Sequence, residues 1–153
     1  ACKDTHVLMV VFTMSIIEIR DRFVNHQPRL FHKQDWYNID AFAKDKGEIG
    51  WRLVAKTPVE NSIGKKWDKQ QKLLGKNDET PSARIMVYTM VGHFLATGER
   101  LFTDIYVRCS DHLSVMSGGN RVVVGVFDSD GLIVNFSWGD DRDSNIGLSS
   151  ARK

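Results

Sequence analysis

The aspartates near the C-terminal end are the side chains whose types and spacing could hold a metal ion. Asp128-Ser129-Asp130-Gly131 resembles the start of a calcium-binding loop, and Asp140, Asp141 and Asp143 would supply further oxygens. The EF-hand loop also needs a distal bidentate glutamate, which this stretch lacks. Because Asp-x-Asp-Gly is also ordinary hairpin chemistry, we interpret the tetrapeptide as a turn. The alternative is a metal-dependent hydrolase or oxidase that uses Asp128, Asp130, Asp140 and Asp141.

Histidine and cysteine show no catalytic or metal-binding pattern. The five histidines form no HExxH motif and have no serine or cysteine partner in a nucleophile elbow. Cys2 and Cys109 have no metal or redox spacing, and we expect two unpaired thiols. No glycine-rich phosphate loop is present. We therefore predict a non-enzymatic protein that requires no cofactor.

An aromatic residue beside the second aspartate group is a candidate for binding. Phe136 lies between Asn135 and Ser137, and one aromatic anchor among small polar residues is typical of a binding patch. The same pattern also fits a core residue, and both interpretations stay open from the residues alone.

A β-hairpin must position these side chains. The apolar runs Arg121–Phe127 and Leu132–Trp138 flank the Asp-Ser-Asp-Gly turn, which is a strong hairpin signal. A polar loop, Gly139–Asn145, follows, and Ile146–Arg152 is expected to be a closing strand. If Trp138 and Leu148 point inward, their neighbours project outward into a surface.

The elements before the hairpin predict an α+β fold. The clearest helix is Pro81–Thr97, with Thr80 as its N-cap and Gly98 as its C-cap. This helix is apolar almost all round, so we expect it to be buried on most sides. A polar helix is expected at Ser62–Leu74, and strands at Gly50–Lys56 and Leu101–Cys109. The order of strand, helix, helix and several strands is typical of an α+β domain.

Residues 1–49 are predicted to form an N-terminal helical extension in front of a core of residues 50–153. Val7–Ile17 is interpreted as a buried strand that passes into a helix. The run is far shorter than the roughly 20 residues that span a bilayer, so we predict no membrane span. Helices are expected at Ser15–Val24 and Gln34–Lys44.

Size and charge restrict the class of protein. A chain of 153 residues is expected to form one domain. The net charge is +2, with both signs interspersed. Because a nucleic-acid binder usually concentrates basic residues on one face, we predict no nucleic-acid partner. The basic run Lys65–Lys72 is interrupted by Asp68, and we interpret it as a solvated helix face.

The residue alphabet changes near the C-terminal end. Residues 1–117 contain ten Lys, five Glu, four Gln and five Met, whereas residues 118–151 contain none of these four types. At the upstream frequency, about seven would be expected. Strands and tight turns disfavour Lys and Glu, but this preference does not exclude Gln and Met as well.

Together with this depletion, the motif Trp138-Gly139-Asp140-Asp141-Arg142, followed by Gly147-Leu148 and Ala151-Arg152, resembles the variable proteins of diversity-generating retroelements, especially those of archaea and very small bacteria. In that family, a reverse transcriptase copies a template with errors at adenines. Template codons of the AAC or AAT kind cannot become Lys, Glu, Gln, Met or Trp. The resemblance implies a C-type lectin fold, with two helices packed on a mainly antiparallel sheet. It also implies a variable region at about residues 121–151.

The resemblance further implies which positions contact a ligand, expected to be a protein or other macromolecule. The positions open to diversification are expected to be Val123, Val126, Asp128, Ile133, Asn135, Phe136, Ser137, Gly139, Asp141, Asp143, Ser144 and Asn145. The invariant scaffold is expected to be Gly125, Phe127, Gly131, Leu132, Trp138, Arg142, Gly147, Leu148 and Arg152, with Arg142 bridging the loop to the sheet through groups such as Asp140. The family's calcium-binding relatives carry Glu-Pro-Asn and Trp-Asn-Asp motifs, which are absent here, so calcium-dependent sugar binding is not expected. A third possibility is a structural phage or surface component.

Overall fold

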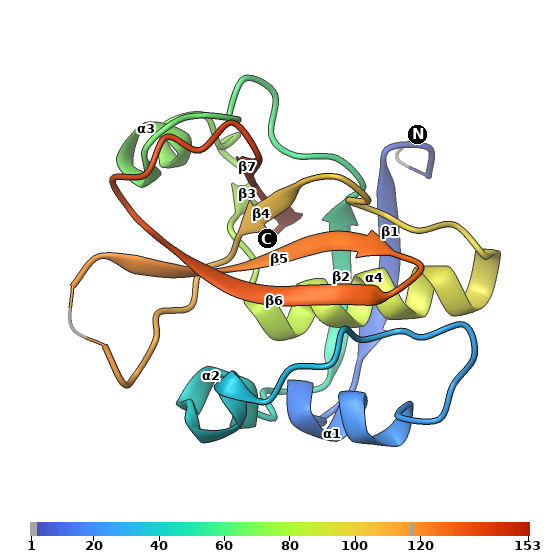
Figure 1. Ribbon diagram of the computed structural model, residues 1–153. Helices are drawn as coiled ribbons and strands as arrows, with labels where there is room; N and C mark the ends of the chain where they lie inside the picture. The colour runs from blue at the N-terminus through green and yellow to red at the C-terminus, as the bar shows by residue number, and fades with distance from the viewer. Residues whose placement is uncertain (1–2, 117) are drawn as a thin grey trace.

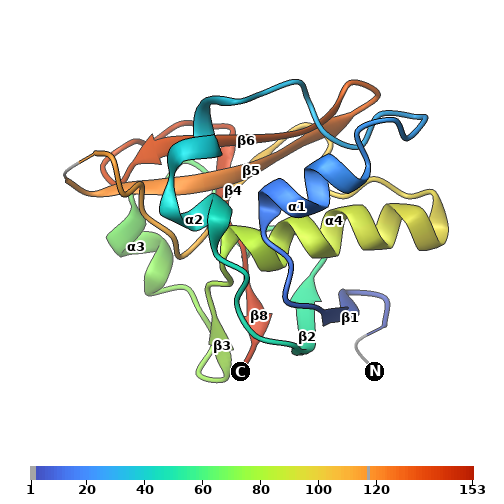
Figure 2. The same ribbon diagram turned by 90° about the horizontal axis from the view of Figure 1, so that it is seen from below.

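A long helix, α4 (Ala83–Thr97), lies between two four-stranded sheets in the computed structural model, which describes residues 3–116 and 118–153 (Figures 1 and 2). The first sheet has the order β1 (His6–Val11), β2 (Gly50–Ala55), β8 (Ala151–Arg152), β3 (Asp78–Glu79). The second has the order β6 (Gly131–Trp138), β5 (Asn120–Asp128), β4 (Tyr106–Arg108), β7 (Ile146–Leu148). The shorter helices are α1 (Ile16–Arg22), the 3₁₀ helix η1 (Trp36–Ile39), α2 (Ala41–Lys44) and α3 (Trp67–Gln71). All described strand pairs are antiparallel except β4 with β7, so the predicted α+β class is confirmed.

Helix α4 is buried because apolar residues occur on nearly all of its faces. Met86, Val87 and Met90 are fully buried, which confirms the predicted central position. The N-cap is Ser82 rather than the predicted Thr80, and the Ser82 hydroxyl accepts a hydrogen bond from the amide of Ile85 at 3.3 Å. Gly98 ends the helix in the left-handed conformation, as predicted.

The predicted hairpin forms between β5 and β6. Their register runs from Asn120 opposite Trp138 to Asp128 opposite Gly131, with an irregularity between Gly125 and Asp128. The Asp128 carboxylate accepts a hydrogen bond from the amide of Asp130 at 2.8 Å, so this aspartate stabilises the turn. The structure therefore supports the interpretation of the tetrapeptide as a turn.

Several elements are shorter than predicted because tertiary contacts replace regular structure. The expected helix Ser62–Leu74 is reduced to α3, since the Ser62 hydroxyl accepts a hydrogen bond from the amide of Leu148 at 3.0 Å instead. The expected strand Leu101–Cys109 is reduced to β4, and Phe102 is buried with a φ of 54°. The expected closing strand is divided into β7 and β8, which belong to different sheets.

Residues 1–49 are not a separate extension. Strand β1 pairs with β2 from His6 opposite Ala55 to Val11 opposite Gly50. Phe31 forms a bridge with Leu132 of β6, and the Gln34 side chain hydrogen-bonds both the amide and the carbonyl of Val134. The expected helix Gln34–Lys44 is interrupted before Ala41 and forms η1 and α2. The prediction of an appended segment is therefore corrected, because these residues supply a strand and part of the common core.

None of the helices in the described ranges is both long and apolar enough to cross a membrane.

Candidate binding surface on the hairpin and loop

The C-terminal hairpin and the loop after it form one side of the molecule. We call this region the hairpin–loop surface and define it as Ile133 and Asn135 of β6, Trp138, and loop residues 139–145. The loop connects the end of β6 to β7 and passes close to α3 (Figure 1). Residues 140–145 are all exposed, whereas the residues before and after the loop include Ser137 and Ile146, which are buried.

Arg108 holds the start of this loop from beneath. Its guanidinium is fully buried and donates hydrogen bonds to the carbonyls of Trp138 at 2.9 Å and Asp141 at 3.0 Å. The same group donates to the Ser137 hydroxyl at 3.0 Å, to the Gln70 side-chain oxygen at 2.9 Å and to the Lys65 carbonyl at 2.8 Å. Burial lowers the pKa of Arg108, and the nearby carboxylates of Asp141 and Asp143 oppose this effect. One side chain thus joins the loop, β6 and α3.

Further main-chain hydrogen bonds fix both ends of the loop. At its start, the Gly139 carbonyl accepts from the amide of Trp67 at 2.8 Å, and the Gly139 amide donates to the Gly119 carbonyl at 2.5 Å. At its end, the Asn145 carbonyl accepts from the amide of Tyr106 at 2.9 Å. None of these bonds uses a side chain of the loop, so these anchors at both ends do not depend on those side chains.

The exposed side chains of the loop differ in how much they contribute to its conformation. The Asp141 carboxylate accepts hydrogen bonds from the amide of Trp138 at 3.0 Å and the Ser137 hydroxyl at 3.3 Å. Asp143 accepts from the amide of Asn145 at 2.8 Å, and Asp140 forms an exposed ion pair with Lys66 at 3.2 Å. Asp141 is therefore both exposed and structural.

The structure places most, but not all, of the predicted contact positions where a ligand can reach them. The exposed ones are Asp128, Asn135, Asp141, Asp143, Ser144 and Asn145, and the half-buried ones are Val126, Ile133, Phe136 and Gly139. Val123 and Ser137 are only 1% and 4% exposed, so their assignment to the surface is corrected. Val123 lies between Arg108 of β4 and Asn135 of β6, and Ser137 lies against the Arg108 guanidinium.

Of the two aromatic residues near the end of β6, Phe136 contacts the core, one of its two open interpretations, and Trp138 is exposed. Phe136 packs against Trp36 with ring centroids 5.7 Å apart and is in contact with the core. Trp138, expected to point inward, is 43% exposed. Because the Gln34 and Trp36 side chains bond the neighbouring Val134 carbonyl, they hold the N-terminal segment along the edge of β6, which this segment covers. Trp138 lies beyond this cover and is the exposed aromatic residue of the surface.

A shallow depression adjoins Trp138. Its lining residues are Trp67, Asp68, Gly119, Arg121, Trp138, Gly139 and Asp140. The Arg121 guanidinium lies over the Trp67 ring, 4.1 Å from its centroid, and so forms a cation–π contact. Trp67, Arg121 and Trp138 come from different elements, so their spacing in the sequence does not indicate that they meet at this depression.

Arg142 does not have the expected bridging role. Its side chain is exposed, and Asp140 pairs with Lys66 instead. The buried arginine that joins the loop to the sheet is Arg108, which sequence reasoning missed. Its only sequence signal is a single charge between the apolar residues Val107 and Cys109.

The four aspartates proposed for a metal enzyme are not brought together. Asp128 and Asp130 lie at the turn between β5 and β6, whereas Asp140 and Asp141 follow the other end of β6. An eight-residue strand separates the two groups, a span of about 25 Å. Within residues 3–116 and 118–153, no group of three or more His, Cys, Asp or Glu side chains could hold a metal ion. The expectation that Asp128, Asp130, Asp140 and Asp141 form one cluster is therefore corrected.

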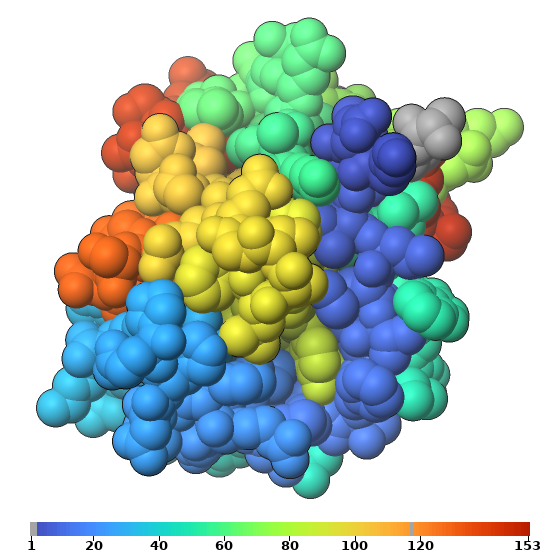
Figure 3. Space-filling view, turned by 90° about the vertical axis from the view of Figure 1, so that its right-hand side faces the viewer, coloured from blue at the N-terminus to red at the C-terminus, as the bar shows by residue number. Residues whose placement is uncertain are grey.

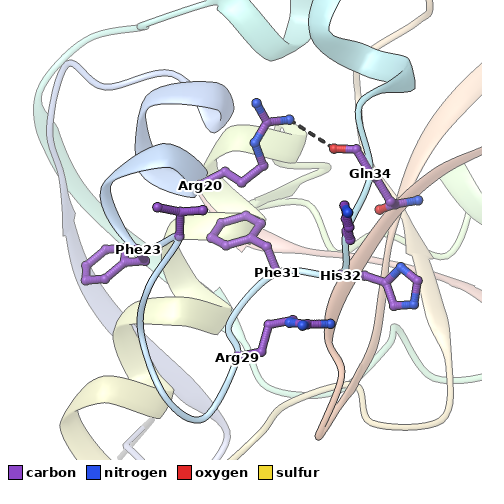
Figure 4. A pocket seen from close by; sticks show the side chains of 8 residues that line it. Arg20, Phe23, Arg29, Phe31, His32 and Gln34 are labelled. Atoms are coloured by element: carbon purple, nitrogen blue, oxygen red, sulfur yellow. Dashed lines mark hydrogen bonds between the residues drawn. The ribbon is translucent and has the colours of Figure 1, made fainter.

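A second hollow lies between the end of α1 and the segment that follows it (Figure 4). Its lining residues are Arg20, Phe23, Val24, Arg29, Phe31, His32, Lys33 and Gln34, with no carboxylate among them. Arg20 donates to the Gln34 carbonyl at 3.1 Å and forms an ion pair with Asp21 at 3.0 Å. The cationic lining makes this hollow unsuitable for a metal ion.

Cys109 and His93 belong to the packed frame of the fold. Cys109 is fully buried and free, and burial raises the pKa of its thiol well above the usual value. Cys2 lies outside the described residues. His93 contacts Glu99 at 2.6 Å at the end of α4, which agrees with a structural histidine.

Comparison of the chain with family models, with curated proteins and with solved structures finds no match.

Proposed function

We propose that this chain is a non-enzymatic binding protein that contacts a protein or other macromolecule through its hairpin–loop surface. Recognition occurs at equilibrium, and a preformed surface reduces the conformational entropy lost on binding. Trp138 serves as the exposed aromatic anchor, and the polar side chains of the loop provide adaptable contacts around it. No cofactor takes part.

The observation that carries this proposal is the anchoring of the loop through its main chain. Arg108 binds the carbonyls of Trp138 and Asp141, and carbonyls are present whatever side chains the loop carries. Ser144 and Arg142 can therefore change without loss of these bonds. A surface that tolerates substitution is what a diversified binding protein requires.

The resemblance to retroelement variable proteins extends this proposal to the origin of the surface. From β2 onward, the major elements follow the order that a C-type lectin fold uses, with α3 and α4 before a run of strands. The absence of Lys, Glu, Gln and Met from residues 118–151 is consistent with mutagenesis at adenines of AAC or AAT codons. We propose that such mutagenesis changes the exposed positions of the hairpin–loop surface.

The gene and its neighbourhood provide the test. We expect a near-copy of the region encoding Val122–Lys153 beside a reverse-transcriptase gene, with mismatches only at adenines of the copy. Among natural variants, substitutions should concentrate at Asn135 and residues 140–145 and spare Leu132 and Val134. A single copy of the region, or substitutions spread evenly over exposed and buried codons, would contradict the proposal.

A further inference from the structure

The outer face of the first sheet is apolar and uncovered. Helix α4 covers the inner face, where Val7, Val11 and Val54 are buried. Figure 2 shows β1, β2, β8 and β3 as one outer layer, with α4 on one side and no element on the other. Because side chains alternate along a strand, the neighbours of these buried valines point away from the core.

These outward side chains form a continuous apolar patch across β1 and β2. Leu8 is 62% exposed and Trp51 is 66% exposed. The register places Leu8 opposite Leu53 and Val10 opposite Trp51, so the four side chains are neighbours on one face. We call these four residues the β1–β2 patch.

Two further exposed apolar residues lie directly at the ends of these strands. Phe12 follows β1 and is 52% exposed, and Ile49 precedes β2 and is 64% exposed. Figure 3 looks onto the edge of this sheet, where β1, in blue, lies at the surface and parts of the teal segment project at the right-hand border. A fully exposed aromatic side chain presents about 150–250 Å². Scaled by their exposed fractions, the six residues together expose about 500 Å² of apolar surface. Apolar patches of this size on a folded domain usually mark an interaction site.

Charged residues border the patch, since Arg52 of β2 and Lys153 line the same hollow as Leu8, Trp51 and Leu53. Arg152 of β8 forms an ion pair with Asp78 of β3 at 3.2 Å, and Glu79 lies beside it. The patch itself carries no charged side chain and no backbone interruption. An apolar centre with a charged rim is the usual anatomy of a protein–protein interface.

We infer that the β1–β2 patch binds the same patch of a second copy of this chain, so that two sheets stack face to face across a two-fold axis. An apolar face with charges of both signs at its border can be complementary to itself, as a two-fold interface requires. Two antiparallel sheets pack in this way at about 10 Å with strand directions within about 30°.

The available area agrees with this partner. A stable interface buries about 800 Å² on each subunit. The apolar residues supply more than half of that area, and the charged margin at Arg152 and Glu79 would supply the rim. The border contains charges of both signs, with Asp78 and Glu79 beside Arg52, Arg152 and Lys153, so two copies can pair opposite charges across the interface.

Dimerisation through this face leaves the proposed binding surface free. The first sheet and the β5–β6 hairpin lie on opposite sides of α4 (Figure 2). A dimer would therefore present two hairpin–loop surfaces directed away from the interface. Two linked sites allow bivalent attachment, which raises the apparent affinity without new contacts.

Sedimentation of the full chain tests this inference. We expect the chain to sediment as a dimer when its concentration is about 0.2 mM. Trp51→Lys and Leu8→Lys should each halve the mass observed and leave the circular dichroism spectrum and the melting temperature unchanged. Val115→Lys is the matched control, since Val115 is 58% exposed in the segment between β4 and β5, and this variant should remain dimeric.

Three outcomes would overturn the inference. The parent chain could be monomeric at every concentration up to about 0.2 mM. The dimer could persist in both Trp51→Lys and Leu8→Lys, or Val115→Lys could lose the dimer to the same extent as these two variants. Flotation with neutral phosphatidylcholine vesicles distinguishes a lipid partner. Binding of the parent chain to these vesicles, lost in Trp51→Lys, together with a monomeric state in their absence, would assign the patch to a membrane surface instead.

Discussion

Replacement of Arg108 by leucine should destabilise the protein more than any exposed substitution in the hairpin–loop surface. The variant removes five hydrogen bonds, to the carbonyls of Lys65, Trp138 and Asp141, the Ser137 hydroxyl and the Gln70 side chain. The last two acceptors lie in buried bonds, so water cannot readily replace the guanidinium there.

The expected loss follows from opposing contributions. Each unsatisfied buried acceptor costs about 1–3 kcal/mol. The variant also no longer buries the charge of the guanidinium, and this gain offsets several kcal/mol of the cost of the unsatisfied acceptors. With two buried acceptors and three part-buried carbonyls left without the guanidinium, we expect a net loss of about 2–4 kcal/mol in the free energy of unfolding. A loss of this size is a large part of the roughly 5–15 kcal/mol that stabilises a typical domain.

Urea unfolding at neutral pH measures this loss. With a denaturant dependence of about 1–3 kcal/mol per molar, the midpoint of Arg108→Leu should fall by on the order of 2 M. Arg142→Leu is the matched control, because Arg142 is exposed in the same loop, and its free energy of unfolding should change by less than about 0.5 kcal/mol. A similar loss in both variants, or a loss below about 1 kcal/mol for Arg108→Leu, would refute the anchoring role.

Three further predictions concern the frame that carries the surface. Gly125→Ala should lower the free energy of unfolding by about 1–3 kcal/mol in urea titrations, because an added Cβ would lie 2.0 Å from the Ile105 carbonyl oxygen. The Cys109 thiol should not react with Ellman's reagent in the folded protein and should react after unfolding in urea, since it is buried with a raised pKa. Burial also raises the pKa of Asp111, which accepts from the Ala83 amide at 2.6 Å. The stability that the protonated Asp111 side chain contributes is therefore fully present below its unfolded pKa and is lost as the pH rises through its folded pKa. In urea titrations across this pH interval, the free energy of unfolding of Asp111→Asn should fall less than that of the parent.

Local signals explain the parts of the fold that the sequence predicts well. The hairpin depends on turn chemistry within four residues, and Gly98 ends α4 through its own backbone conformation. Such features need no knowledge of the rest of the chain. The N-cap of α4 was misplaced because Thr80 and Ser82 are both suitable caps around Pro81, and the choice depends on where helical hydrogen bonding begins.

Long-range contacts explain the features that were wrong or missed. The expected Ser62–Leu74 helix is shorter because Ser62 bonds β7. Residues 3–49 belong to the common core because β1 finds its partner in β2, and the paired residues are 39 to 49 positions apart in the sequence. Periodicity within a segment contains no information about such partners.

The candidate site shows the same division. The residue alphabet and the polar loop indicate where the surface lies, and residues 140–145 are exposed as expected. The inward turn of Phe136 depends on Trp36, and the anchor at Arg108 depends on three separate segments. These roles require the assembled fold.

The central claim is that the frame is stable whatever side chains the exposed loop carries at positions 140, 142, 144 and 145. Its most direct test is the distribution of unfolding free energies in a library randomised at Asp140, Arg142, Ser144 and Asn145, compared with a library randomised at Val122, Val124, Leu132 and Val134. We predict that most members of the loop library stay within about 1 kcal/mol of the parent, whereas most members of the second library unfold. Equal loss of folded protein in both libraries would contradict the claim.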